Sequence, residues 1–150
     1  MKKKVFLAGL AVLLLASCRQ AEPIASLDFE QTMSANGYRV LDVTHQIAGD
    51  HINVILLGIS GSETYQFEFY DFVSDAQAQF FFQNMRDDFE ANRASPFTQS
   101  ATSGRNSARF QLTAGGVYVQ MLRRANTVII VQVDEGRRDA VANLIGILDN

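Results

Sequence analysis

The sequence lacks tryptophan and has very little cysteine or lysine. Cys18 is the single cysteine among the 150 residues, so disulfide bonds, multi-cysteine metal sites and cysteine nucleophiles further along are excluded. The three lysines stand at positions 2–4, and the other ten basic residues are arginines. These arginines form no basic stripe, because Arg123-Arg124 and Arg137-Arg138 are only pairs. Nucleic-acid binding is therefore not expected.

Long apolar runs are also scarce, and the one that is present lies at the N-terminus. Val5–Ser17 spans 13 residues directly after the lysines, which is the pattern of a signal peptide. As a helix at about 1.5 Å per residue it would cover roughly 20 Å, well short of the ~30 Å hydrocarbon core of a bilayer. A permanent transmembrane helix is therefore not expected here.

The residues that close this run indicate lipid attachment. Leu15-Ala16-Ser17-Cys18 resembles the lipobox of bacterial lipoproteins. The resemblance implies that lipoprotein processing enzymes cleave before Cys18 and that its sulfur carries a diacylglyceryl group, whose two chains anchor stably. It implies a position on the extracytoplasmic face of a cell membrane. Arg19 follows the cysteine, in the position where an aspartate favours retention in the inner membrane. The outer membrane is therefore favoured if the host has two membranes. An ordinary signal peptide cut in the same region is the alternative.

Removal of the predicted signal, residues 1–17, would leave an acidic protein. Ten arginines would then stand against 16 acidic residues, a formal charge of −6. We expect residues 18–26 to be a lipidated tether and residues 27–150 to form a single domain. Such a domain would be repelled by anionic lipid headgroups, so its contact with the membrane would come through the anchor.

Hydrophobic periodicity predicts three helices and six strands. The expected helices are 27–36, 75–92 and a last one capped by Asp134-Glu135, with Ser26 or Asp28 capping the first and Gly37 ending it. The expected strands are 38–45, 52–59, 64–72, 106–113, 117–122 and 127–133. Turns are expected at Gly49-Asp50, at Gly58 to Ser62, at 114–116 and at 123–126. The Ser/Thr/Ala-rich segment 94–105 predicts the longest loop.

The element order predicts an α+β fold. It is a mostly antiparallel twisted sheet of about six strands in the order α-βββ-α-βββ-α, with helices packed on it. The stripe Ala78, Phe81, Phe82, Met85 and Phe89 marks the buried side of the middle helix. The segments 65–70 and 123–130, with the helices that follow them, resemble small bacterial lipoproteins of uncharacterised function with one α+β domain. A PsbP/Mog1-like α/β/α sandwich, suggested by element order alone, is the alternative.

The sequence offers few candidates for catalysis or cofactor binding. His45 and His51 are the only histidines, and with nearby aspartates they fall short of a zinc site, which needs three or four ligands. Ser60 and Ser62 stand in glycine-rich turns without the Gly-X-Ser-X-Gly spacing of a hydrolase. The dipeptide Gly115-Gly116 precedes a strand and cannot direct helix amides at a phosphate. We therefore predict no catalytic residues, no metal and no cofactor.

Aromatic residues are the one surplus, with eleven phenylalanines and four tyrosines. Tyr70 and Phe80 do not fall on the apolar face of their predicted strand and helix. We therefore expect both side chains to be exposed and to mark a binding surface. The preferred hypothesis is therefore a non-enzymatic envelope module that binds another envelope protein or a peptide. A carrier with an apolar pocket between the sheet and the Phe-rich helix, and an envelope hydrolase, are the alternatives.

Overall fold

The computed structural model describes residues 21–60 and 66–150, so the predicted signal, Cys18 and the segment 61–65 lie outside it. Seven antiparallel strands form one sheet in the order β1-β2-β3-β7-β6-β5-β4. The strands are β1 Tyr38–Asp42, β2 Ile52–Ser60, β3 Gln66–Phe72, β4 Phe97–Ser103, β5 Ser107–Ala114, β6 Val117–Arg124 and β7 Thr127–Asp134. The helices are α1 Ser26–Ala35, α2 Thr44–Ile47, α3 Asp75–Asn92 and α4 Arg138–Leu148, with a 3₁₀ turn at Glu135–Arg137. The predicted α+β class is confirmed, with seven strands rather than six.

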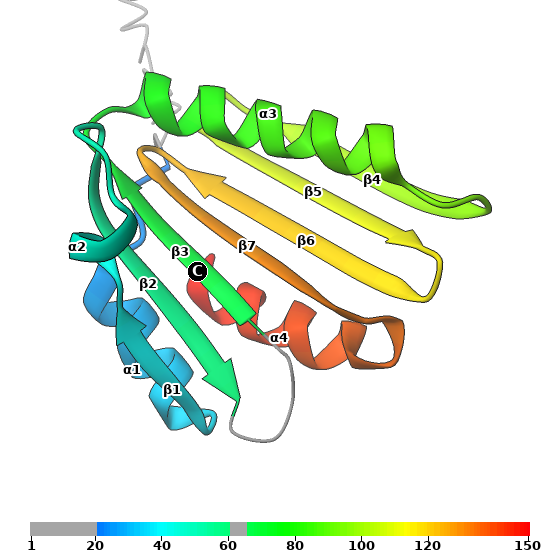
Figure 1. Ribbon diagram of the computed structural model, residues 1–150, viewed down its shortest axis with the longest axis horizontal. Coiled ribbons are helices and arrows are strands. Elements are labelled where there is room, and N and C mark those ends of the chain that lie inside the picture. Colours follow the sequence, from blue (N-terminus) through cyan, green and yellow to red (C-terminus); the bar gives the residue numbers. More distant parts are fainter. Residues whose placement is uncertain (1–20, 61–65) are drawn as a thin grey trace, which may run out of the picture.

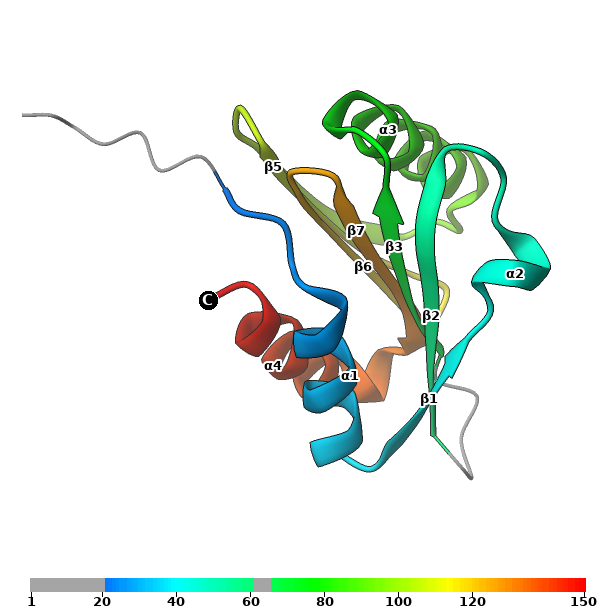
Figure 2. The ribbon, with the colours of Figure 1, turned by 90° about the vertical axis from the view of Figure 1, so that its left-hand side faces the viewer.

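Helices cover both faces of the sheet. Helices α1 and α4 lie on one face and α3 lies on the other, as the α/β/α alternative has them (Figures 1 and 2). The core is accordingly divided into two clusters. One joins the sheet to α1 and α4 through Phe29, Phe69 and Ile145, and the other joins it to α3 through Phe82, Phe110 and Met121.

In strand β3, side chains on both faces of the sheet are apolar, because each face is covered by a helix. Phe67 and Phe69 pack toward α1 and α4, whereas Phe72 packs toward α3. Tyr70 shares the α3 side, and its ring lies 4.8 Å from that of Phe81 and 6.0 Å from that of Phe72. Tyr70 is therefore half-buried, and the expectation of an exposed side chain at this position is wrong. Side chains of both parities are covered here, because helices pack on both faces of the sheet.

The packed domain begins before its first helix. Ile24 is buried, and its N–H donates to Thr127 Oγ1 at 3.0 Å. Helix α1 then starts after Ala25, without the side-chain cap expected from Ser26 or Asp28. The predicted stop at Gly37 is confirmed, since this residue has a φ of +83° and donates to the Ser34 carbonyl.

Gly58 lies within β2 and not in the turn predicted for it. A Cβ at this position would come 3.2 Å from Met33 Sδ and 3.3 Å from Phe67 Cβ. The missing side chain thus lets α1 approach the sheet closely.

Two segments differ from the expected elements. The predicted loop 94–105 contains β4, whose seven residues are all exposed and pair with β5. The predicted strand 38–45 ends at Asp42, whose side chain accepts from the Thr44 backbone N–H at 2.9 Å as α2 begins. At the C-terminal end, the 3₁₀ turn precedes α4, so Asp134 and Glu135 do not cap that helix with their side chains.

Candidate functional site

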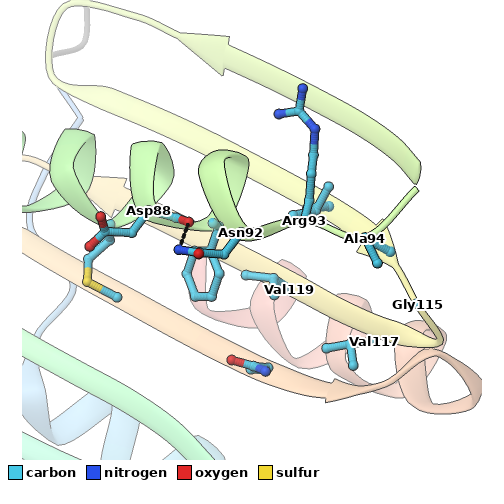
Figure 3. Close-up of a pocket in the computed structure, with 12 residues that line it drawn as sticks. Asp88, Asn92, Arg93, Ala94, Gly115, Val117 and Val119 are labelled. Carbon is cyan, nitrogen blue, oxygen red and sulfur yellow. Dashed lines mark hydrogen bonds between the residues drawn. The ribbon is translucent and has the colours of Figure 1, made fainter. Parts of the chain in front are cut away.

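A pocket of about 460 Å³ lies between the C-terminal half of α3 and the sheet (Figure 3). Met85 and Phe89 of α3 form one wall, because they belong to the apolar stripe that faces the sheet. Leu112 of β5 and Val119 of β6 form the floor, and both are buried. The pocket exists because α3 ends at Asn92 and leaves the adjoining strands without a helix above them. Its volume falls within the roughly 300–1,000 Å³ of small-molecule sites.

Polar groups stand only around the rim of this pocket. Asp88 and Asn92 lie on the helix side, where Asn92 Nδ2 donates to the Asp88 carbonyl at 2.9 Å. Gln132 of β7 lies on the opposite side and is exposed. In Figure 3 the guanidinium of Arg93 points away from the other labelled side chains. The arrangement suits an apolar group that enters the floor while a polar part stays at the rim.

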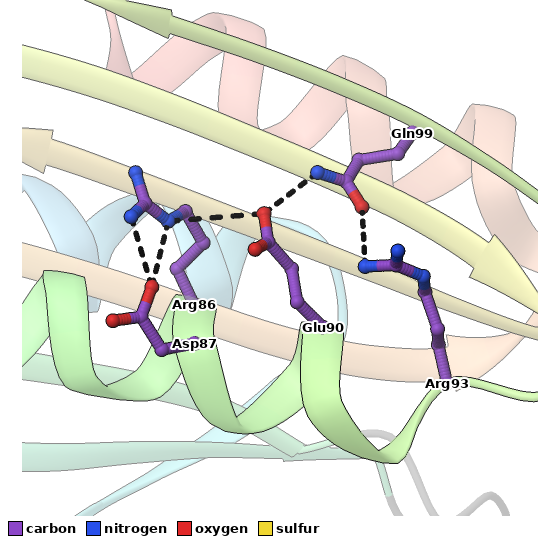
Figure 4. Close-up of polar contacts among 5 residues, drawn as sticks. All are labelled: Arg86, Asp87, Glu90, Arg93 and Gln99. Carbon is purple, nitrogen blue, oxygen red and sulfur yellow. Dashed lines mark hydrogen bonds and ion pairs between the residues drawn. The ribbon is translucent and has the colours of Figure 1, made fainter.

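Arg93 belongs instead to a polar network that joins α3 to β4 (Figure 4). Its Nη1 donates to Gln99 Oε1 at 3.3 Å, and its guanidinium lies 4.0 Å from the ring centre of Phe97. Gln99 Nε2 then donates to Glu90 Oε1 at 2.7 Å. Arg86 continues the network, with its Nη2 2.8 Å from Asp87 Oδ1 and its Nε 3.8 Å from Glu90 Oε1. The edge strand β4 is thereby tied to the helix by side chains.

The residues expected to mark a binding surface are not equivalent in the structure. Phe80 is 67% exposed, as expected, because it lies roughly 200° around α3 from the buried Ala78 at 100° per residue. Tyr70 lies beneath α3 in an aromatic cluster with Phe72 and Phe81. Its hydroxyl donates to Glu68 Oε2 at 2.5 Å, and burial, together with this carboxylate, raises the pKa of Tyr70 well above its usual value of 10.0. Of the two predicted residues, Phe80 is therefore the one whose ring is accessible.

The histidine pair does not form a metal site in the described part of the chain. His45 lies in α2 and His51 directly precedes β2, and both are exposed. Within residues 21–60 and 66–150, no group of three or more His, Cys, Asp or Glu side chains is close enough to hold a metal ion. The Gly115-Gly116 turn has positive φ at both residues and leads into β6, as predicted.

Sequence reasoning predicted the place of the pocket but not its residues. Met85 and Phe89 were identified as core residues of the helix, and Val117 to Val119 as part of a strand. The sequence predicts that the helix ends at Asn92, but not that this leaves Val117 of β6 and Gln132 of β7 beyond its cover. The register of β5, β6 and β7, which brings Leu112 opposite Val119 and Val119 opposite Gln132, is needed to see the site.

Comparisons with known proteins support the fold. No family model and no curated protein matches this chain. A crystal structure described as a GTP-binding regulator from Thermotoga maritima is similar, with a TM-score of 0.52 and 17% sequence identity. The similarity covers 83% of this chain and 88% of that one. At this identity the two chains share the arrangement of helices and strands, which places this chain among α+β proteins with an antiparallel sheet and helices packed on it.

Proposed function

We propose that this protein is a lipid-anchored, extracytoplasmic binding module of a bacterial cell envelope and has no enzymatic activity. Three lysines, a 13-residue apolar run and Leu15-Ala16-Ser17-Cys18 support the anchor. In the described residues, no helix combines the length and apolarity needed to cross a bilayer.

The pocket beneath the end of α3 is the observation that carries the binding role. Its floor is apolar and its rim is polar, which is the usual character of a site that takes a small molecule or an inserted side chain. An envelope protein or peptide that inserts one apolar side chain is the preferred ligand. The same pocket favours, as a second candidate, a carrier of a small amphipathic molecule.

The other functions considered have less support. No cluster in the described residues favours the hydrolase alternative, since His45 and His51 are exposed and no metal-binding group surrounds them. The similar structure is described as a GTP-binding regulator, but nucleotide binding is not part of our proposal. The Gly115-Gly116 turn here leads into a strand, and a phosphate-binding loop needs the amides of a helix N-terminus.

The anchor is tested by replacing the cysteine. In Cys18→Ser, we expect the precursor to remain unprocessed at this site and to carry no acyl chains, because the serine hydroxyl cannot replace the thiol as the lipid acceptor. Mass spectrometry of the N-terminus and membrane fractionation measure both properties. A wild-type protein that retains residues 1–17, or that has a free Cys18 and remains in the soluble fraction, contradicts the proposal.

The pocket is tested by photo-crosslinking in living cells. A photoreactive phenylalanine analogue at Asn92, on the pocket rim, should give one discrete adduct, whereas the same analogue at exposed Glu30 of α1 should not. A protein-sized adduct supports the envelope partner, and an adduct of a few hundred daltons supports the carrier. Equal labelling at both positions, or none at Asn92, argues against a ligand in this pocket.

A further inference from the structure

A second pocket, of about 230 Å³, lies on the other flank of α3, between the helix and the edge of the sheet. Gln79, Gln83 and Arg86 of α3 form its helix side, with Phe82 beneath them. Ala101 and Ser103 of β4 form the opposite side, and Ala108 of β5 and Arg123 of β6 complete it. This pocket shares no lining residue with the pocket beneath the end of α3.

Arg123 is the unusual residue in this pocket, because its side chain is charged and only 4% exposed. Met121, two residues earlier, packs toward α3, so the alternation of strand β6 directs Arg123 to the same side. Its Nη1 donates to the Ala125 carbonyl at 3.3 Å. Its Nε is fully buried and has no hydrogen-bond partner among the described residues. A buried N–H group without a partner costs roughly 1–3 kcal/mol, and more when it is charged.

The charge of Arg123 is not neutralised by an adjacent carboxylate. In the described part of the chain, ion pairs within 4.0 Å include those of Arg86, Arg109 and Arg124, and none involves Arg123. Asp75 acts on it only electrostatically, while burial lowers the pKa of Arg123 below its ordinary value. Arginine nevertheless remains protonated at neutral pH. The pocket therefore contains a positive charge that no carboxylate of the described residues pairs with directly, within 4.0 Å.

We propose that this pocket binds a small oxyanion, the carboxylate or phosphate group of a ligand, with Arg123 as its anchor. The guanidinium presents N–H groups in a planar fork that matches both kinds of oxyanion. The amides of Gln79 and Gln83 add donors, and so does the hydroxyl of Ser103, which pairs in register with Ala108 and so shares the α3-facing side. Arg86 already contacts Asp87 and Glu90, so its charge is balanced and it contributes less.

The size of the pocket supports a small group. At about 230 Å³ it is below the usual range of small-molecule sites, about 300–1,000 Å³, yet it is large enough for several water molecules. Such a space fits an oxyanion with its residual hydration, or the anionic end of a larger molecule whose remainder stays in solvent.

The test uses the full-length protein in detergent micelles at constant ionic strength. Thermal unfolding is followed while sodium phosphate or sodium acetate replaces sodium chloride. We expect Tm to rise saturably with at least one of the two anions, and the Nε–Hε resonance of Arg123 to shift with the same concentration dependence. Saturation by phosphate, by acetate or by both identifies the oxyanion. If Tm in phosphate and in acetate stays equal to Tm in sodium chloride at the same ionic strength, the proposal is overturned.

Four variants locate the binding. Arg123→Met should remove the saturable response while unfolding at the wild-type temperature or above without added anion, because the unpaired buried nitrogen is gone. Exposed Arg105→Met should keep the response. If Arg123→Met does not fold, Gln83→Glu tests the proposal instead. A carboxylate at this exposed pocket position should weaken anion binding at least tenfold, because it repels the anion. Asn84→Asp, on the same helix but outside the pocket, should leave anion binding unchanged. An unchanged response in Gln83→Glu or in folded Arg123→Met overturns the proposal.

Discussion

Thr127 connects the start of the folded domain to the centre of the sheet. Its side chain is 1% exposed, and its Oγ1 accepts from the Ile24 N–H at 3.0 Å and donates to the Arg124 carbonyl at 2.8 Å. Ile24 is itself buried in the cluster that joins the sheet to α1 and α4. This hydroxyl thus holds the chain segment that would lead to the membrane anchor, and we predict that Thr127→Val weakens the fold measurably.

The magnitude follows from the two hydrogen bonds. Valine keeps the shape of threonine but leaves the buried Ile24 N–H without an acceptor, at a cost of roughly 1–3 kcal/mol. The lost bond to Arg124 adds about 1 kcal/mol, for a total of about 2–4 kcal/mol. With an unfolding entropy of about 2.1 cal/mol/K per residue, a domain of about 130 residues loses roughly 4 °C of Tm per kcal/mol. We therefore expect Tm to fall by about 8–16 °C.

Thr127→Ser is the matched control, because it keeps the hydroxyl and loses only a methyl group, which costs about 1 kcal/mol. Urea unfolding measures the free energy of both variants, and hydrogen exchange reports the protection of the Ile24 amide. Thr127→Val should be the less stable variant by at least 1 kcal/mol and should lose protection at Ile24, whereas Thr127→Ser should keep it. Equal stability of the two variants, or a protected Ile24 amide in Thr127→Val, would refute the reasoning.

Three further predictions concern the face of the sheet covered by α3 and the contact of α1 with Gly58 on the other face. Phe82→Ala should cost about 3–5 kcal/mol in urea unfolding, because Phe82 is 4% exposed, whereas Phe80→Ala, at a 67% exposed ring, should stay within about 0.5 kcal/mol. The stability of the wild type should fall above about pH 10, because the unfolded chain ionises its tyrosines there while Tyr70 stays neutral in the fold. Tyr70→Phe should make that fall shallower in unfolding measured from pH 9 to 11.5, and an unchanged slope would count against the raised pKa. Gly58→Val should cost about 1–3 kcal/mol, since even the first added carbon contacts its neighbours at 3.2–3.3 Å, and a wild-type Tm would contradict this.

The elements that could be predicted from the sequence have a strong apolar pattern. Strands β2, β3, β5, β6 and β7 and helices α1 and α3 lie within about two residues of their predicted bounds. Strand β4 could not be predicted, because Phe97–Ser103 has no apolar alternation and is exposed on both sides. Seven consecutive pairs with β5 hold it, from Phe97 with Ala114 to Ser103 with Ala108. Backbone pairing of this kind leaves no periodic signal in side chains.

The caps of α1 and α4 were mispredicted because tertiary contacts override local capping residues, whereas α3 starts at Asp75 after Ser74 as predicted. Helix α1 follows directly on Ile24, whose burial and bond to Thr127 fix where the chain enters the fold. At the other end, the Glu135 N–H donates to the Gly116 carbonyl at 2.8 Å and holds the residues after β7 against the β5–β6 turn. The 3₁₀ turn follows from this contact, and α4 begins two or three residues later than a cap at Glu135 or Asp134 would place it.

The buried arginine was beyond sequence reasoning for a related reason. In the sequence, Arg123-Arg124 is an ordinary pair at the end of a strand, where charged side chains are common. The alternation of β6 sends the two in opposite directions. Arg124 meets Asp149 after α4, with Nη1 2.8 Å from its carbonyl oxygen, whereas Arg123 turns under α3. Only the observed layers show that, among the described residues, Arg124 forms an ion pair with Asp149 and Arg123 forms none.

The two pockets have a common physical origin in the unequal cover of the sheet. Seven strands at about 4.8 Å spacing make a sheet roughly 29 Å wide, while a helix with its side chains is about 10–12 Å in diameter. Helices α1 and α4 lie on one face, whereas the other face has a single long helix, α3, and the four-residue α2 beside β2 (Figures 1 and 2). Strips of sheet therefore remain uncovered on both flanks of α3. On one flank the pocket floor is formed by apolar strand residues, and on the other flank the pocket lies toward β4 and is lined by Arg123. Small residues keep both pockets open, because longer side chains would fill these spaces. Gly115 lines the pocket beneath the end of α3, and Ala101 and Ala108 line the pocket of Arg123.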